Sequence, residues 1–379
     1  MIDFSLSPEQ EVLRDLARDF AQKEIVPLAP QLEREQLHSE EVVEKCYRLG
    51  LLHYGVPKEY GGGGLGSLEG CLLAEELAAA CAGVEVGLYG NILGLLPLLI
   101  AGSPELKHEL LPRHCSGSNV AALCLTEAEA GSDVRSIRTR VRRVADQYII
   151  EGTKRFITNG GVASLYSVFA QEQRELGYKG ISAFIVPRDT PGLSFGKRED
   201  KMGQRSTDTR EVIFEEVRIP SRFRLGEGHD GFNIAMKTLD ASRPVVGAQA
   251  VGIARAAFEA AVAYVKQQVP SDGAGVASQG IHFMLADMAI KVEAARLVCW
   301  HAAWLGDHGH RNTKESAIAK CFASDIAVEV TTDAVQVLGW PGYMKDRPVE
   351  RYMRDAKAHQ IFEGTNQIQR LVIARQLVR

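Results

Sequence analysis

The sequence offers no basis for a disulfide framework or a cysteine-rich metal site. Its seven cysteines are odd in number, widely scattered and never spaced as CxxC, a pattern typical of reduced thiols. Cys124 lies in an apolar run and is expected to be a buried, inert thiol. His308 and His310 have no cysteine or carboxylate set at a supporting spacing, so we expect solvated loop histidines and no metal site.

Excess positive charge and long apolar runs are also lacking. The net charge of −4 argues against a nucleic-acid-binding face, although it allows a local cationic site for a phosphorylated ligand. The longest apolar run, residues 92–101, is about half of the roughly 18 residues that a membrane helix needs. The N-terminal segment is acidic and shows no basic stretch followed by an apolar one, which disfavours a targeting signal. We therefore expect no membrane span and a bacterial cytoplasmic location, with a mitochondrial matrix as the alternative.

No internal repeat is present, but the periodicity of the chain changes twice. Residues 1–118 carry apolar side chains at helical spacing, beginning after Ser7, which is typical of an N-cap within a capping box. Residues 119–228 hold short β-branched and aromatic runs divided by turn residues, which predicts an antiparallel β domain. Residues 229–379 return to long helical periods, so the expected order is helical, β, helical.

The individual elements follow from the same patterns. We expect helices at 40–51, 67–80, 93–100, 105–111, 244–266, 281–305, 313–338 and 366–377, and strands at 148–150, 166–169, 181–186 and 212–214. The glycine-rich residues 61–64 lack the GK[ST] ending of a phosphate-binding loop, so they predict an interhelical turn. The Gly-, Ala- and Ser-rich residues 269–280 predict an exposed loop.

Two polar segments of the middle zone carry chemistry. The segment CLTEAEAGSD, residues 124–133, follows a strand-like run, and its hydroxyls and backbone N–H groups can bind a flavin edge or a phosphate. Its alternative is a plain polar loop. The segment GTKRFITNG, residues 152–160, places Phe156 beside Thr158, which suits stacking on and hydrogen bonding to a flat heterocycle. Its Asn-Gly pair is equally typical of a hairpin turn.

A third segment, HQIFEGTNQIQ at residues 359–369, contains a candidate base. Glu363 follows Ile361 and Phe362 and precedes a helix that Thr365 or Asn366 could cap. Apolar neighbours desolvate a carboxylate, which raises its pKa and strengthens it as a base. The alternative is a glutamate that only favours the dipole at the start of a helix.

Together these segments resemble the acyl-CoA dehydrogenase family along the length of the chain. CLTEAEAGSD looks like the flavin-and-substrate loop of that family, KRFITNGG like its second flavin loop, and IFEGTNQIQ like its catalytic turn. The segments MGQRSTDTREVIFEEVRIP, ASRPVVGAQAVGIA and RNTKESAIAKCFASDIA look like its medium-chain-type branch. The resemblance implies an N-terminal helical domain (1–118), a middle β domain (119–228) and a C-terminal four-helix bundle (229–379).

The resemblance also implies an activity. It is the FAD-dependent α,β-dehydrogenation of a short- to medium-chain or branched acyl-CoA to the trans-2-enoyl-CoA, in fatty acid β-oxidation. Glu363 would be the catalytic base and flavin N5 the hydride acceptor. The implied partners are an electron-transfer flavoprotein and further copies of the chain in a homotetramer, a dimer of dimers. Two alternatives are a desaturase or oxidase of carrier-protein thioesters in biosynthesis and a flavin-poor protein that only binds acyl-CoA.

Other site residues are implied position by position. The cofactor contacts would be Leu125, Thr126, Phe156, Thr158, Gln268, Gln279, Gln336, Gly339, Thr365 and Gln367. The substrate contacts would be Tyr89, Ser132, Asp240, Arg243 and Gly364. The ring of Tyr89 could shorten the acyl cavity, or it could be an ordinary core tyrosine.

Some positions depart from the family pattern. Gln268 stands where an arginine is expected, and Ser271 and Asp272 stand where the family has Phe-Gly. Trp340 replaces the second glycine of a Gly-Gly pair, and Ala128-Glu129 replaces Pro-Gly. These changes gather on the adenine and pyrophosphate end of FAD, where a lost charge-assisted contact would cost about 1.5–3 kcal/mol.

Overall fold

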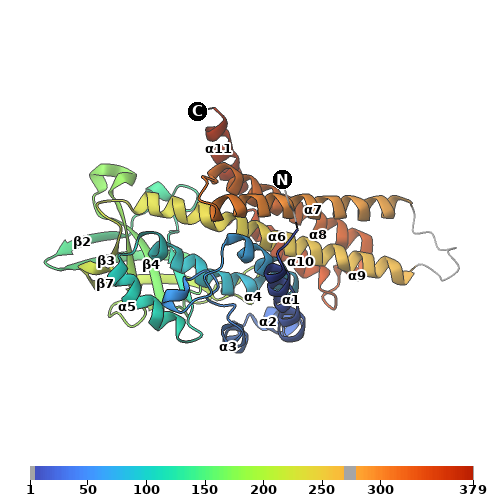
Figure 1. Cartoon of the computed structure of the whole chain (residues 1–379), viewed down its shortest axis with the longest axis horizontal. Coiled ribbons are helices and arrows are strands. Elements are labelled where there is room, and N and C mark those ends of the chain that lie inside the picture. Colours follow the sequence, from blue (N-terminus) through green and yellow to red (C-terminus); the bar gives the residue numbers. More distant parts are fainter. Residues whose placement is uncertain (1–4, 269–278, 379) are drawn as a thin grey trace.

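A computed structural model describes residues 5–268 and 279–378 (Figure 1). The strands gather at one end of the molecule. The long helices extend to the other end, and they are α6 (Gly231–Gln268), α7 (Gln279–Asp307) and α8 (Thr313–Leu338). Ser271, Asp272 and most of the predicted loop at 269–280 lie outside the described residues, but Gln279 and Gly280 already belong to a helix. The order helical, β-sheet, helical is confirmed.

The N-terminal zone is helical. The capping box predicted at Ser7 is present, because the Ser7 side chain accepts from the backbone of Gln10 and the Gln10 side chain accepts in return. Its helices are α1 (Pro8–Phe20), α2 (Ala29–Glu35), α3 (Glu40–Arg48), α4 (Ser67–Ala101) and α5 (Pro104–Cys115), with a π-helical turn at Ala21–Ile25 and a 3₁₀ turn at Lys58–Tyr60. Residues 61–64 form the turn before α4, as predicted.

The helices expected at 67–80 and 93–100 are one helix, α4, with a kink at Cys81. The prediction of two helices was wrong because glycines interrupt the apolar period between them. Two of these glycines let the β-sheet approach: a Cβ on Gly94 would lie 2.5 Å from the Ala122 nitrogen, and one on Gly90 would lie 2.8 Å from Thr158 Cγ2. The helix therefore packs directly against the segments that carry the predicted flavin contacts.

The middle zone is a mixed sheet with the order β6-β7-β3-β2-β4-β5-β8, and β1 also pairs with β4. Most pairs are antiparallel as predicted, but β1 runs parallel to β4, and β2 meets β4 in parallel at one position. The strands are β1 (Ala121–Cys124), β2 (Arg140–Val144), β3 (Gln147–Thr158), β4 (Leu165–Gln171), β5 (Ile181–Pro187), β6 (Leu193–Phe195), β7 (Thr209–Pro220) and β8 (Arg224–Leu225). Just beyond β1, the carbonyl of Thr126 accepts from the backbone N–H of Arg155 at 2.8 Å, at the bulge near the end of β3.

In the C-terminal zone, the described residues 229–268 and 279–378 form three long helices and three shorter ones. The helices are α6 (Gly231–Gln268), α7 (Gln279–Asp307), α8 (Thr313–Leu338), α9 (Trp340–Tyr343), α10 (Val349–His359) and α11 (Asn366–Leu377). α8 and α11 have the predicted bounds. α6 begins at Gly231 and accommodates Pro244 within it, so the prediction that this helix starts at the proline was wrong.

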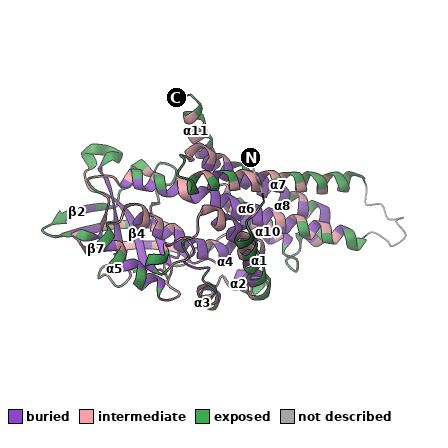
Figure 2. Cartoon of the chain, in the orientation of Figure 1, coloured by how far each residue is buried: buried purple, intermediate pink, exposed green. Residues whose placement is uncertain are grey.

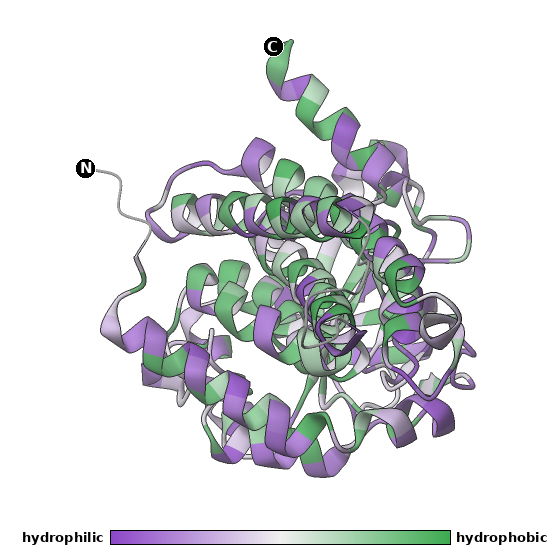
Figure 3. Ribbon diagram, turned by 90° about the vertical axis from the view of Figure 1, so that its right-hand side faces the viewer, coloured by the Kyte–Doolittle hydropathy of each residue, from purple (hydrophilic) through white to green (hydrophobic). Residues whose placement is uncertain are grey.

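Within the part of the chain that the structure describes, two helices, α4 and α6, are long and apolar enough to cross a membrane by length and composition. However, 67% and 72% of their apolar windows are buried inside the molecule. Figure 2 shows purple, buried segments along the middle of the long helices, and Figure 3 shows hydrophobic segments gathered toward the centre of the view. Both helices therefore serve as core helices of this fold.

Candidate active site

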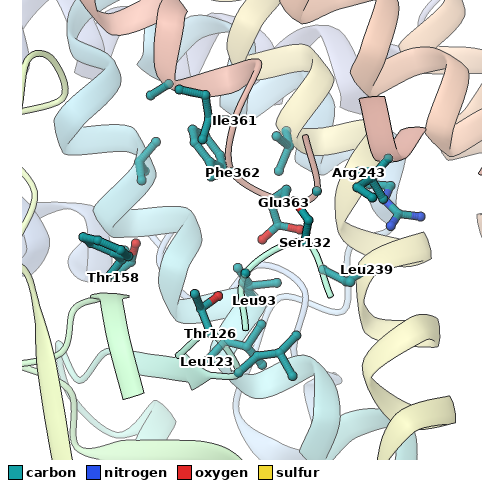
Figure 4. Close-up of a pocket in the computed structure, with 18 of the residues that line it drawn as sticks. Leu93, Leu123, Thr126, Ser132, Thr158, Leu239, Arg243, Ile361, Phe362 and Glu363 are labelled. Atoms are coloured by element: carbon teal, nitrogen blue, oxygen red, sulfur yellow. The ribbon is translucent and has the colours of Figure 1, made fainter. Parts of the chain in front are cut away.

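A cavity of about 850 Å³ lies where the three zones meet (Figure 4). Side chains reach it from α4, from the segment after β1, from the end of β3, from the loop before β7, from α6 and from the turn between α10 and α11. Nine of the residues implied by the resemblance line it: Tyr89, Leu125, Thr126, Ser132, Phe156, Thr158, Arg243, Glu363 and Gly364. Segments far apart in the sequence thus converge on one space.

Glu363 lies in the short turn that joins α10 to α11. Its backbone is left-handed, with φ of +55°, and Gly364 follows with φ of +90°. Left-handed backbone is costly for a residue that has a Cβ, so the surroundings must hold this turn in place. In Figure 4 the Glu363 carboxylate points into the space that Thr126 and Leu93 border.

The environment of Glu363 makes it a stronger base. Burial raises the pKa of its carboxyl above the ordinary value, while the Ser242 hydroxyl, Arg243 and Lys320 oppose this shift. The Ser242 hydroxyl donates to Glu363 Oε2 at 2.8 Å. A desolvated carboxylate with one hydrogen-bond donor is suited to removing a proton from a weak carbon acid.

The turn that carries Glu363 is supported from two helices. Gln369 Nε2 on α11 donates to the carbonyl of Glu363 at 3.1 Å and to the carbonyl of Gly364 at 2.9 Å. Lys320 Nζ on α8 donates to the carbonyl of Gly364 at 2.7 Å. Thr365 caps α11, because its hydroxyl accepts from the backbone N–H of Ile368. The predicted cap of this helix is therefore confirmed, with Thr365 as the capping residue.

The side of the cavity formed by the end of β3 and the segment after β1 combines an aromatic ring with hydroxyls. Phe156 has left-handed backbone, with φ of +58°, at a β-bulge near the end of β3, and its ring is 56% exposed. The segment carrying Leu125 and Thr126 is held by Lys154, whose fully buried ammonium group donates to the Leu125 carbonyl at 3.1 Å and to Glu127 Oε1 at 2.8 Å. Ala128 and Glu129, which depart from the pattern described above, lie at the exposed tip of the adjoining turn.

Asp240 does not line this cavity. It accepts from Arg243 Nη1 at 2.9 Å and from the Thr313 hydroxyl at 2.6 Å. Asp240 lines a second cavity, of about 600 Å³, and Met236 borders both cavities.

The remaining implied cofactor contacts also lie outside the main cavity of this single chain. Gln268, Gln279, Gln336, Gly339 and Gln367 are exposed, and Trp340 is 79% exposed. Thr365 is half-buried, but its hydroxyl caps α11. Their contact with a cofactor therefore remains a prediction.

Sequence reasoning missed several side chains that act on the site. Ser242 is next to Arg243, but nothing in the local pattern shows that it meets a residue 121 positions away. The sequence could have indicated a special role for Lys320, because this lysine interrupts the apolar face of α8. Ala317 and Ala327 belong to that face, and both are fully buried. Lys201 lines the cavity and donates to the Thr209 hydroxyl at 2.7 Å, yet it lies in a loop without periodicity.

The cysteines and the two loop histidines, His308 and His310, were considered above as possible reactive or metal-binding residues. All seven cysteines are free and buried, and burial raises the pKa of the Cys124 thiol to about 12. His308 stacks on Trp304 at 4.2 Å between ring centroids. Within residues 5–268 and 279–378, no group of three His, Cys, Asp or Glu side chains could hold a metal ion.

With this fold and site in view, the chain is a member of the acyl-CoA dehydrogenase family. It matches the N-terminal domain of that family over residues 7–118, the middle domain over 122–217 and the C-terminal domain over 229–378. It is similar to an acyl-CoA dehydrogenase of Bacillus subtilis (strain 168), at 44% identity over 98% of this chain and 99% of the relative. It is an oxidoreductase that acts on CH–CH groups with a flavin.

Two solved structures share the fold over their whole length. Butyryl-CoA dehydrogenase from Megasphaera elsdenii superposes with a TM-score of 0.96 at 40% identity, covering 100% of both chains. A chain from the structure of the electron transferring flavoprotein of Acidaminococcus fermentans, studied for flavin-based electron bifurcation, superposes with a TM-score of 0.96 at 43% identity, again covering 100% of both chains.

FAD is the cofactor of this chain. A structure of PigA in complex with FAD superposes on 100% of the chain and 99% of its own length, with a TM-score of 0.93 and 29% identity. The residues of the main cavity fit a flavin ring. They include the exposed ring of Phe156, the hydroxyls of Thr126 and Thr158 and an otherwise mostly apolar lining.

Proposed function

We propose that this enzyme dehydrogenates a short- to medium-chain acyl-CoA thioester at its α and β carbons, with Glu363 as the base. The observation that carries the proposal is the position of Glu363. Its carboxylate faces a cavity bordered by Thr126, Thr158 and Phe156, and its pKa is raised by burial. A base on one side and a flavin site on the other suit removal of two hydrogens from a thioester between them.

The chain's own residues account for the first half of the reaction. Glu363 removes the proton from the α carbon, and the electrons of that C–H bond form the new double bond. The bound FAD supplies the acceptor for the hydride that leaves the β carbon. The backbone N–H of Glu363 donates to no acceptor within the described residues, so it is available to the thioester oxygen, where negative charge develops.

The position of Tyr89 in the wall of the cavity supports a short or medium acyl chain. Tyr89 lines the cavity, is buried, and donates its hydroxyl to the carbonyl of Ser242 at 3.3 Å. This bond fixes the ring against the wall that also holds the donor to Glu363. The similarity to butyryl-CoA dehydrogenase is consistent with a short substrate. The CoA moiety would extend toward the second cavity, where Asp240 and Lys237 lie.

The partners belong to the same proposal. Reoxidation of the flavin requires an electron acceptor, and we propose an electron-transfer flavoprotein, in line with the similarity to the Acidaminococcus structure. We also propose a homotetramer in a bacterial cytoplasm, acting in β-oxidation. Exposed apolar side chains on α7 and α9 support burial against further copies: Phe283, Ile290, Trp304, Trp340 and Tyr343.

Glu363→Gln tests the proposal. Purified wild-type and variant holoenzymes are mixed anaerobically with acyl-CoAs of increasing length, and bleaching of the flavin absorbance is followed. We expect the variant to keep its flavin spectrum and thermal stability. Its rate of flavin bleaching should fall by about 10²–10⁴-fold or more. Wild-type bleaching rates in the variant would remove Glu363 from this role. Carrier-protein thioesters in the same assay test the biosynthetic alternative.

A further inference from the structure

A fully buried lysine lies beneath the catalytic turn. Lys320 lies in the N-terminal half of α8, and none of its surface is exposed. Its ammonium group donates to the Gly364 carbonyl at 2.7 Å and to Asn366 Oδ1 at 2.9 Å. A lysine is almost never fully buried unless it is paired, so this position calls for a physical explanation.

The second acceptor of Lys320 belongs to a firmly held network. Asn366 donates to Asp325 Oδ1 at 2.7 Å and to the Ser324 hydroxyl at 2.9 Å. Asp325 also accepts from Arg370 at 2.7 Å. The carboxylate of Asp325 on α8 therefore already has two donors, Asn366 and Arg370. Among the described residues, Lys320 forms no ion pair within 4.0 Å.

The remaining counter-charge of Lys320 is Glu363. Among the nearby charges, Glu363 is the strongest of those that favour the protonated lysine. In turn, Lys320 favours the ionised form of Glu363. The other titratable groups that face this pair come from α4, α6, α8 and α10. They are Tyr89, Arg243, Cys321, Asp325 and His359.

We propose that Lys320 is a positioning residue for Glu363: its buried ammonium group holds the left-handed turn through the Gly364 carbonyl and so places a positive charge next to the residue that follows the base. This inference rests on the proposed function. Three hydrogen bonds from Lys320 and Gln369 hold the two carbonyls of the turn, and only Lys320 adds a positive charge to them. The buried charge acts strongly because little water screens it.

The direction of the effect follows from the charges. Burial lowers the pKa of Lys320 to about 8, so the lysine is mostly charged at neutral pH. Its charge lowers the pKa of Glu363, against the effect of burial. Removing the charge should therefore raise the pKa of Glu363 and leave less of the base ionised at a given pH below that pKa.

Two variants separate the charge from the hydrogen bond. Lys320→Met removes both, whereas Lys320→Gln keeps an N–H donor for the Gly364 carbonyl and removes only the charge. The readout is the pH dependence of anaerobic flavin bleaching in the holoenzyme, together with the midpoint of thermal unfolding. The acid limb of this profile is the fall in rate at low pH as Glu363 becomes protonated. We expect it to move to higher pH by about one unit in both variants. Lys320→Met should also lose more thermal stability than Lys320→Gln.

The control is Ser324→Ala, which removes a hydroxyl from the Asn366 network and leaves the lysine in place. Its acid limb should match that of the wild type. An unchanged acid limb in Lys320→Gln, with only a lower unfolding midpoint, would show a purely structural lysine and overturn the proposal. Failure of the proposed function is a different outcome, because it would appear as full bleaching in Glu363→Gln.

Discussion

The hydroxyl of Ser242 lies 2.8 Å from Oε2 of Glu363 and 3.2 Å from the carbonyl of Leu239. A hydroxyl has one proton to donate, so it can bond either oxygen but not both fully. While Glu363 is ionised, the proton is best placed on the carboxylate. If Glu363 takes up a proton, as proposed, the hydroxyl can instead donate to the Leu239 carbonyl and accept from the protonated carboxyl group. Ser242 thus has a partner in both states of the base.

Ser242→Ala should leave less of Glu363 ionised at low pH, because it removes the hydrogen-bond donor to the carboxylate. The hydroxyl lowers the pKa of Glu363, so its loss raises that pKa and moves the acid limb of the bleaching rate to higher pH. We expect a shift of about one pH unit, because a hydrogen bond to a charged group is worth about 1.5–3 kcal/mol before exposure to the cavity is allowed for. The measurement is the rate of anaerobic flavin bleaching as a function of pH.

Thr238→Val is the matched control for Ser242→Ala. Thr238 is a buried residue on the same helix, one turn earlier, and its hydroxyl has no hydrogen-bond partner among the residues that the structure describes. Removing this hydroxyl should leave the acid limb where it is in the wild type. Equal shifts in the two variants would mean that Ser242 acts through packing and not through its hydrogen bond.

The sequence predicts Glu363 as the base, but it does not predict the residues that support it. Glu363 stands between apolar neighbours and a glycine, so its desolvation can be predicted from the adjacent residues. Ser242 and Lys320 act on it from α6 and α8, and their contacts depend on how these helices pack against the turn. Such contacts are set by tertiary structure, which local periodicity does not report.

The fold shows the same division. The order helical, β-sheet, helical and the bounds of α8 and α11 follow from periodicity and capping, which are local properties of the sequence. The continuity of α4 and the parallel pairing of β1 with β4 are non-local. In α4, Gly90 and Gly94 weaken the helical pattern in the sequence because they are needed for close approach to the sheet.

The structure also predicts how the protein responds to acid through His114. This histidine is 3% exposed, and its ring nitrogens lie 2.8 Å from Asn91 Oδ1 and 3.0 Å from the Ser164 hydroxyl. Burial, and then the nearby His53, lower the pKa of His114 to about 3. The folded state therefore keeps it neutral, whereas the unfolded chain binds a proton near pH 6.5. Its contribution to stability is present above about pH 6.5 and is lost as the pH falls toward 3.

His114→Gln should flatten this part of the pH dependence. Glutamine retains a donor for Asn91 but cannot titrate, so the variant should lose less stability than the wild type between pH 6 and 4. Linkage sets the scale at up to about 1.4 kcal/mol for each pH unit. Thermal unfolding midpoints across this range provide the measurement, and His310→Gln, at an exposed histidine, is the control. Parallel curves for wild type and His114→Gln would contradict the assignment.

Tyr89 provides the test of chain length. Its ring is 6% exposed and lines the cavity, and its hydroxyl donates to the Ser242 carbonyl. Tyr89→Ala removes the ring, so the cavity should lengthen and the preference should move toward longer acyl-CoAs. One added methylene in an apolar pocket is worth about 1–3 kcal/mol, which corresponds to roughly 10–200-fold in kcat/KM. Tyr89→Phe keeps the ring and loses only the hydroxyl, so its chain-length profile should match that of the wild type. If Tyr89→Ala also kept the wild-type profile across the acyl-CoA series, the ring would belong to the core and another side chain would close the cavity.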